Sequence, residues 1–300
     1  MKPVKSVDIS IITVVKDDAT GLQQTASSII EQSVAAEEWI ILDGESDAST
    51  CDLLDELGKI PNVRVSSASP RGIYDAMNKA CELATTEWLW FINAGDVLVD
   101  NNSLELISQM IPLNSNIGII ATPVLQTTPS GYFYSFTSPE IELVDGHKFA
   151  IFHHQGCLIN RKKFVELGGY DSKLKYAADG KLLDRVIGCS EVLYINSPFV
   201  IFQLGGRSWS NLSETLKEIQ TYRKLNITFI QLQILLFKNK LRYLTLPVSP
   251  SFIVKIYLSY RQKKMLELSP WKITTNTRSR MSGMIPCFIK QLGLMKNNYE

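Results

Sequence analysis

Residues 8–15 read Asp-Ile-Ser-Ile-Ile-Thr-Val-Val, a nearly continuous run of apolar and β-branched residues. Runs of this kind are typical of strands that are covered on both faces in a parallel sheet. Beyond the polar residues 16–21, apolar side chains recur at helical spacing, at Leu22, Ala26, Ile29 and Ile30. Thr20 is a candidate N-cap for that helix. The stretch therefore predicts a strand, a loop and a helix as the first unit of an α/β fold.

The same alternation of strand and helix patterns continues toward residue 96. Strands are expected at residues 39–42, 63–66 and 88–92, and helices at residues 49–57 and 73–84. This alternation predicts a doubly wound, mostly parallel sheet with right-handed crossovers. Ligands bind beyond the carboxyl ends of the strands in such sheets. The candidate binding loops are therefore residues 16–21, 43–50, 67–72 and 93–96.

The alternation loosens after residue 96. A helix is expected at residues 161–167, and short strands are expected at residues 117–121, 132–136, 157–159 and 192–195. These strands predict a small antiparallel extension that closes over the first half. From about residue 213 the chain becomes helical, apolar and basic, so we expect one domain over residues 1–212 and a mainly helical C-terminal appendage over residues 213–300.

Charge is distributed unevenly along the chain, although the net charge is only +1. Residues 1–210 hold 16 Lys and Arg against 26 Asp and Glu, whereas residues 211–300 hold 15 against 4. A basic appendage of this kind indicates contact with an anionic surface. Residues 226–242 combine an apolar helical stripe with Lys238, Lys240 and Arg242, which predicts either an interfacial amphipathic segment or a helix packed on the first domain. Nucleic-acid binding is disfavoured, because no recognition motif accompanies the charge.

The first residues lack the long apolar core of a secretion signal. The most apolar segment, residues 227–237, is about half the roughly 20 residues that a membrane span needs. None of the five cysteines forms a C-x-x-C pair, so zinc spacing and a disulfide framework are not indicated. These features predict a cytoplasmic protein, either free or peripheral on the inner face of the cytoplasmic membrane.

Two acidic residues follow predicted strands at the ligand edge. Asp96 ends the tetrapeptide Asn93-Ala-Gly-Asp96, where a carboxylate can hold a divalent cation against a diphosphate or serve as a turn residue. Asp43 can accept hydrogen bonds from a base or ribose, or cap its own loop. Between them, Gly72 permits close backbone approach to a phosphate at a helix start. Tyr74 is interpreted as a core residue.

Eight segments, in this order, resemble the inverting, family-two glycosyltransferases with a GT-A fold, particularly the bacterial ones that build colanic acid, capsule and O-antigen. The resemblance extends over about residues 8–210. The segments are residues 10–15, 38–44, 72–79, 88–96, 154–155, 168–171, 178–179 and 205–208.

The resemblance implies a role for each of several residues. Asp43 would contact the nucleotide, Asp96 would be the metal-binding end of a degenerate D-x-D motif, and Asp179 would be the general base. The further donor-binding or nucleotide-binding residues would be Thr13, Gly72, Asp75, Asn78 and Asn93. The acceptor or diphosphate contacts would be His154, Arg207 and Ser208.

The implied cofactor is a divalent cation, Mn²⁺ or Mg²⁺. A cation would neutralise the departing diphosphate while a base takes the proton of the acceptor hydroxyl. From the residues alone, the favoured role of Asp179 is the N-cap of the helix that follows it.

The expected function is transfer of a sugar, with inversion, from a nucleotide-sugar donor to a saccharide or polyprenyl-diphosphate-linked acceptor in bacterial surface polysaccharide synthesis. A nucleotidyltransferase is disfavoured, because residues 16–21 do not form a glycine-rich phosphate loop. A catalytically inactive sugar-nucleotide-binding module would be expected to lose Asp96 or Asp179. The donor is left undetermined, because residues 69–71 and 44–50 depart from the family pattern.

Overall fold

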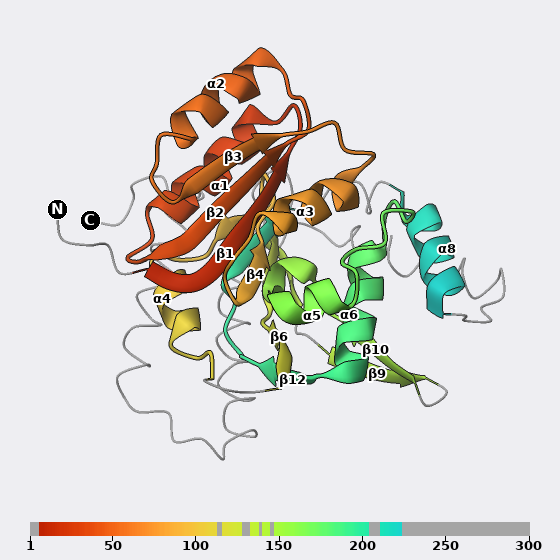
Figure 1. Cartoon of the computed structure of the whole chain (residues 1–300). Coiled ribbons are helices and arrows are strands. Elements are labelled where there is room, and N and C mark those ends of the chain that lie inside the picture. The colour runs from red at the N-terminus through yellow and green to blue at the C-terminus, as the bar shows by residue number, and fades with distance from the viewer. Residues whose placement is uncertain are drawn as a thin grey trace.

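The computed structural model describes residues 6–112, 116–127, 133–137, 140–144, 147–203 and 211–223 (Figure 1). Its centre is a seven-stranded sheet with the strand order β12-β6-β11-β4-β1-β2-β3. Neighbouring strands are parallel except for β11, which is antiparallel to both β4 and β6. The strands are β1 (Ser6–Val15), β2 (Ala35–Asp43), β3 (Val63–Ser67), β4 (Trp88–Phe91), β6 (Ile117–Ala121), β11 (Cys157–Asn160) and β12 (Glu191–Tyr194).

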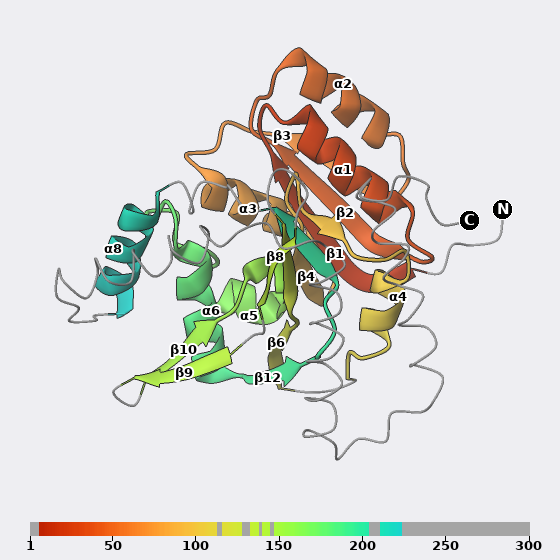
Figure 2. The ribbon, with the colours of Figure 1, turned by 180° about the vertical axis from the view of Figure 1, so that it is seen from behind.

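Helices cover both faces of this sheet. The helices on one face are α1 (Ala19–Ile30), α2 (Ala48–Leu57) and α4 (Ser103–Ser108). Those on the other are α3 (Ile73–Glu82), α5 (Arg161–Glu166) and α6 (Ala178–Cys189). Figure 2 shows α1 and α2 in front of the sheet, whereas Figure 1 shows α3, α5 and α6 in front. Ile9 and Ile11 of β1 belong to the first core, and Ile12 and Val14 belong to the second. The expectation of a strand buried on both faces is thereby confirmed.

The second half of the chain also contributes two smaller sheets. One has the order β5-β13-β7-β8, and the other is the antiparallel pair of β9 and β10. Their strands are β5 (Val97–Leu98), β7 (Val124–Thr127), β8 (Phe133–Thr137), β9 (Glu140–Val144), β10 (His147–Ile151) and β13 (Val200–Gln203). Three of the strands expected in the antiparallel extension, β6, β11 and β12, belong to the main sheet, where β11 supplies the antiparallel pairings with β4 and β6.

A 3-10 turn and one further helix complete the described chain. A 3-10 turn, η1 (His154–Gly156), precedes β11, and α8 (Leu212–Arg223) contacts α6. The N-cap of α1 is Asp18, whose carboxylate accepts the Gly21 N–H at 2.8 Å, so the expectation for Thr20 was wrong. Asp18 prevails because Thr20 already lies inside the first helical turn.

Some predicted features lie outside the described residues. They are Arg207, Ser208 and the basic segment of residues 226–242. The boundary between residues 212 and 213 stays a prediction. Among the described residues, no helix is long and apolar enough to cross a membrane.

Candidate active site

The loop after β2 is built around Asp43. This side chain is 4% exposed and accepts the Ser46 N–H at 3.1 and 3.3 Å, together with the Ser67 hydroxyl at 3.1 Å. The loop after β1 is joined to it, because the Asp17 N–H donates to the Ser46 hydroxyl at 2.9 Å. Asp17 and Glu45 both adopt left-handed φ angles, of 53° and 63°. Strained backbone of this kind clusters at ligand sites.

The loop after β4 carries Asn93 and Asp96. Gly95 has a φ of 93°, a conformation that favours glycine, and its N–H donates to the Thr25 hydroxyl of α1 at 3.0 Å. The Asn93 N–H donates to the Asp96 carboxylate at 3.2 Å. Asp96 is 4% exposed, and its carboxylate faces the Gln155 side chain. The turn therefore holds a buried carboxylate at the carboxyl end of the central strand.

Burial raises the pKa of Asp96 to about 7, although His154, the Asn93 N–H and Gln155 act in the opposite direction. Nearby, the Asn93 side-chain oxygen Oδ1 is buried and has no hydrogen-bond partner among the described residues. Buried polar atoms are nearly always paired, so an orphaned oxygen indicates a missing partner. Oxygen atoms are the ligands that Mg²⁺ and Mn²⁺ prefer. Within the described residues, no group of three or more His, Cys, Asp or Glu side chains could hold a metal ion by itself.

Asp179 is the second residue of α6. Its Oδ1 atom accepts the Tyr74 hydroxyl at 2.9 Å, and its Oδ2 atom lies 3.1 Å from Nδ1 of His154. The N-cap of α6 is Ala177, which has no capping side chain, so Asp179 is not the N-cap. Burial raises the pKa of Asp179, but the hydrogen bond from His154, with smaller effects from the Gly180 N–H and Tyr74, lowers it below the ordinary value. The side chain is still 26% exposed. It is therefore an ionised carboxylate that solvent can reach.

His154 connects Asp179 to the loop after β4. Its Nε2 atom lies 3.5 Å from the Asn93 side-chain nitrogen, while its Nδ1 atom faces Asp179. One tautomer satisfies both contacts: Nδ1 carries the proton that it donates to Asp179, and Nε2 accepts from Asn93. Asp96, Asn93, His154 and Asp179 thus form one continuous chain of contacts.

Other predicted site residues have different surroundings. Thr13 is fully buried, and its hydroxyl donates to the Ile92 carbonyl at 2.6 Å and accepts the Trp39 indole N–H at 2.9 Å. The structure therefore does not bring the Thr13 side chain to the ligand edge. Asn78 instead holds the backbone of Tyr170 through contacts of 2.8 and 2.9 Å.

Asp75 and Gly72 lie at the start of α3. Asp75 accepts the Arg71 N–H at 3.0 Å and lies 3.6 Å from the Lys79 ammonium. Gly72 is exposed and extended, and a Cβ added there would meet nothing within 4 Å. Space for a ligand is therefore open beside the Gly72 backbone, although its conformation does not require glycine.

Two residues of this site were missed by sequence reasoning. Tyr74 was interpreted as core; it is buried, but its hydroxyl bonds the carboxylate of Asp179, and burial raises its pKa well above the ordinary value. The Gln155 side chain faces Asp96, and the backbone carbonyl of Gln155 accepts the Trp90 indole N–H at 2.8 Å. The available signal was position, because Tyr74 and Gln155 both fall inside segments of the recognised pattern.

Comparison with known proteins identifies a family and several similar proteins. The model of the family described as Glycosyl transferase family 2 matches residues 10–168. A PGL/p-HBAD biosynthesis glycosyltransferase, found in both Mycobacterium tuberculosis (strain ATCC 25177 / H37Ra) and Mycobacterium bovis (strain BCG / Pasteur 1173P2), is 22% identical over 260 residues. The matched region covers 85% of this chain and 98% of that protein.

Two solved structures share the fold. TarS 1-349 of S. aureus in complex with UDP has a TM-score of 0.54 and 10% identity, over 94% of this chain and 80% of that chain. The mannosyltransferase PcManGT from Pyrobaculum calidifontis, in complex with GDP-Man and Mn²⁺, has a TM-score of 0.54 and 12% identity, over 97% of this chain and 87% of that chain. At these identities the likeness concerns the fold alone, and the expected GT-A type is confirmed.

Proposed function

The chain belongs to glycosyl transferase family 2, and on that premise we propose that it transfers a sugar, with inversion, from a nucleoside-diphosphate sugar to a hydroxyl of a saccharide or lipid-linked saccharide. The observation that carries this proposal is the Asp179 carboxylate, which Tyr74 and His154 hold in one orientation while leaving it 26% exposed. A single displacement needs one such base on the acceptor side.

Asp179 would act as the general base. Its lowered pKa keeps the carboxylate free of a proton, so it can accept one from the acceptor hydroxyl. The acceptor oxygen then forms a bond to the anomeric carbon, while the bond from that carbon to the diphosphate breaks and the diphosphate departs with the electron pair. Attack from the side opposite the leaving group inverts the configuration. Tyr74 and His154 would keep the carboxylate aligned for that transfer, and alignment supplies much of the rate in such reactions.

The loop after β4 would hold a divalent cation through Asp96 and the side-chain oxygen of Asn93. The buried carboxylate with a pKa of about 7 and the orphaned Asn93 oxygen both fit this role. When bound, the cation would neutralise charge on the departing diphosphate. The Mn²⁺ in the complex of the Pyrobaculum calidifontis mannosyltransferase supports this part of the proposal.

Asp43 and the joined loops after β1 and β2 would bind the nucleotide, and the open backbone at Gly72 would approach the phosphates. UDP and GDP-Man in the two solved structures support a nucleotide-sugar donor.

Arg207 and Ser208 are proposed as acceptor or diphosphate contacts on the sequence resemblance alone. We also propose a polyprenyl-diphosphate-linked acceptor in bacterial surface polysaccharide synthesis and a basic tail that meets anionic membrane, supported by the resemblance and by the charge of residues 211–300.

Thermal unfolding of the purified full-length protein tests the donor and cation together. The protein is mixed with a panel of nucleoside-diphosphate sugars in Mn²⁺, in Mg²⁺ or in EDTA. We expect one donor class to raise the melting temperature with a cation present, because a ligand that binds only the native state stabilises it. An equal rise in EDTA would contradict the role of the cation. The absence of a response to every donor in all three conditions would contradict the proposed function.

A further inference from the structure

Helix α6 carries Asp179 but begins without a capping side chain of its own. Its N-cap residue is Ala177, which offers no side-chain acceptor to the free N–H groups of the first turn. Helices usually begin with Ser, Thr, Asp or Asn, whose oxygen pairs such groups and fixes the entry of the chain. The orientation of the proposed base therefore depends on contacts from elsewhere in the molecule.

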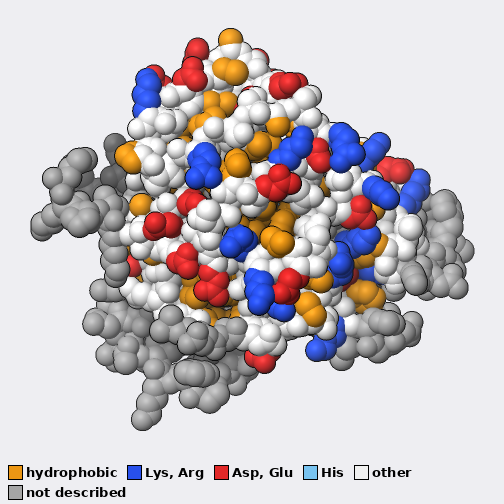
Figure 3. Space-filling model, viewed as in Figure 1, with side chains coloured by type: hydrophobic (Ala, Val, Ile, Leu, Met, Phe, Trp, Pro, Cys, Tyr) orange, Lys and Arg blue, Asp and Glu red, His pale blue; other side chains and the backbone are white. Residues whose placement is uncertain are grey.

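Glu218 of α8 supplies these contacts. One oxygen of its carboxylate accepts the Lys175 N–H at 2.8 Å, and the other accepts the N–H groups of Tyr176 and Ala177 at 2.9 and 3.1 Å. A single side chain thus fastens three consecutive backbone groups that lead directly into α6. A negative charge at this end also complements the helix dipole. Lys and Arg side chains gather on the side of the molecule where α3, α6 and α8 lie, which favours a carboxylate there (Figure 3).

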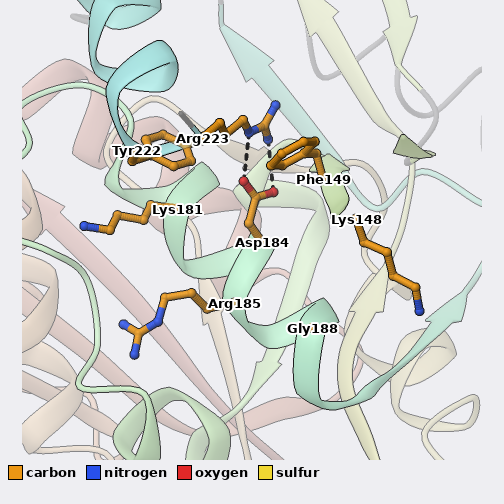
Figure 4. Close-up of a pocket in the computed structure, with 8 residues that line it drawn as sticks. All are labelled: Lys148, Phe149, Lys181, Asp184, Arg185, Gly188, Tyr222 and Arg223. Atoms are coloured by element: carbon orange, nitrogen blue, oxygen red, sulfur yellow. Dashed lines mark hydrogen bonds and ion pairs between the residues drawn. The ribbon is translucent and has the colours of Figure 1, made fainter. Parts of the chain in front are cut away.

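Two further contacts hold α8 along α6. A Cβ added at Gly180 would lie 2.8 Å from the Tyr222 hydroxyl oxygen, so α8 approaches α6 closely at that point. Arg223 donates to the Asp184 carboxylate at 2.8 and 3.0 Å and lies 4.6 Å from the centre of the Phe149 ring (Figure 4). Contacts at residues 175–177, 180 and 184 follow α6 over its first two turns. Asp179 meanwhile points toward Tyr74 on α3.

We propose that Glu218 is a positioning residue for the base: it fixes the start of α6 and thereby holds the Asp179 carboxylate against Tyr74 and His154. This inference rests on the proposed role of Asp179. Glu218 would not touch the donor, because its hydrogen bonds to the described residues go to the backbone of residues 175–177 and not to the loops after β1, β2 and β4. Loss of Glu218 should therefore slow the transfer step and leave donor binding unchanged.

The test compares Glu218→Ala with Glu214→Ala in the full-length protein. Glu214 lies one turn earlier on α8, and within the described part of the chain its carboxylate pairs with Lys217 alone, at 2.8 Å, with both side chains more than half exposed. We expect Glu218→Ala to lower kcat about ten- to a hundredfold, because small displacements of a catalytic group have effects of that size. The KM for the donor and the amount of nucleoside diphosphate bound per mole should be unchanged. Glu218→Gln, which keeps one acceptor oxygen, should lie between Glu218→Ala and the parent. Glu214→Ala should match the parent.

A double-mutant cycle separates positioning from a general structural role. With Asp179→Asn already present, Glu218→Ala should not reduce the residual transfer any further, because there is no base left to position. An equal further loss in that background, a parallel fall in bound nucleoside diphosphate, or an unchanged kcat in Glu218→Ala would overturn the inference. If Glu218→Ala is insoluble, Glu218→Gln provides the same cycle. Full transfer by Asp179→Asn alone would instead overturn the proposed role of the base, and so marks a failure of the proposed function.

Discussion

The loops after β2 and β4 each bury an aspartate, and Asp43 and Asp96 are both 4% exposed. The loop after β2 surrounds its carboxylate with the Ser46 N–H and the Ser67 hydroxyl. The loop after β4 instead holds a carboxyl whose pKa burial raises to about 7, next to an Asn93 oxygen without a partner among the described residues. The two aspartates are thus equally buried, but their loops differ. The loop after β2 supplies hydrogen-bond donors to its carboxylate, whereas the loop after β4 contains a buried oxygen without a partner among the described residues.

A buried polar group without a hydrogen-bond partner lowers the stability of a folded protein. Groups of this kind with shifted pKa values concentrate at functional sites. In the proposed function, Asp43 would have a large structural share in its role, whereas Asp96 and the Asn93 oxygen would be completed by the bound cation. Substitutions that alter one loop and not the other test this division.

The largest effect is expected at Asp179, which the loop after β4 reaches through His154. Asp179→Asn keeps the size of the side chain but cannot take a proton, so transfer should fall by about 10²–10⁴. The melting temperature and the donor affinity should stay near those of the parent. Asp171→Asn is a suitable control, because Asp171 has a similar exposure and is paired with Lys181. The measurement is the steady-state transfer rate of both variants. A similar loss of rate in Asp179→Asn and Asp171→Asn would refute the role of Asp179 as the base.

The next largest effect is expected for Asp96→Asn. Removal of a charge that holds the cation should lower transfer about a hundredfold, since cation contributions amount to several kcal/mol. Without cation or donor, however, the variant should melt no lower than the parent, because an amide avoids the cost of a buried carboxylate. Calorimetry with and without Mn²⁺ and donor measures both quantities. A melting temperature that still rises with Mn²⁺ and donor would assign the cation to other residues.

For Asp43→Asn we expect a loss of stability even without ligand, in contrast to Asp96→Asn. The substitution weakens the acceptor for the Ser46 N–H and the Ser67 hydroxyl, so the free energy of unfolding should fall by about 1–3 kcal/mol. Binding of the free nucleoside diphosphate and of the intact donor should weaken alike, by about tenfold. Chemical denaturation and titration calorimetry provide the two values. A loss confined to the intact donor would move Asp43 to the sugar subsite.

The smallest effect is expected for Tyr74→Phe, which removes one hydrogen bond to Asp179. A net contribution of about 1 kcal/mol corresponds to roughly a fivefold loss in kcat. Tyr170→Phe is the matched control, because Tyr170 lies 5.4 Å away, ring centre to ring centre, and its buried hydroxyl has no partner among the described residues. The control should keep full activity. Equal rates for the two variants would show that the Tyr74 hydroxyl does not support the base.

The first half of the fold could be predicted from sequence because its signals are local. The apolar run of β1 and the helical spacing of α1 lie within about twenty residues of each other, and the strand ends expected from such patterns placed Asp43 and Asp96 at the carboxyl edge of the sheet, where the structure has them. The position of β11 could not be predicted in this way. It lies between β4 and β6 through pairings with distant segments, which no local pattern reports.

The site was predictable where a residue follows a strand and unpredictable where its partner is distant. Tyr74 lies on the apolar face of α3, so its spacing is that of a core residue, and its hydroxyl partner Asp179 is 105 residues away. Thr13 shows the opposite case, since the family resemblance implied a ligand contact, but its hydroxyl bonds the Trp39 indole and the Ile92 carbonyl inside the core. Side-chain direction, rather than position in the chain, separates the two.

The most direct test of a single displacement is the anomeric configuration of the product. Once the donor panel identifies a substrate, NMR of the new glycosidic linkage compares its configuration with that of the donor. A single attack by an acceptor hydroxyl that Asp179 deprotonates predicts an inverted linkage. A retained configuration would contradict that mechanism.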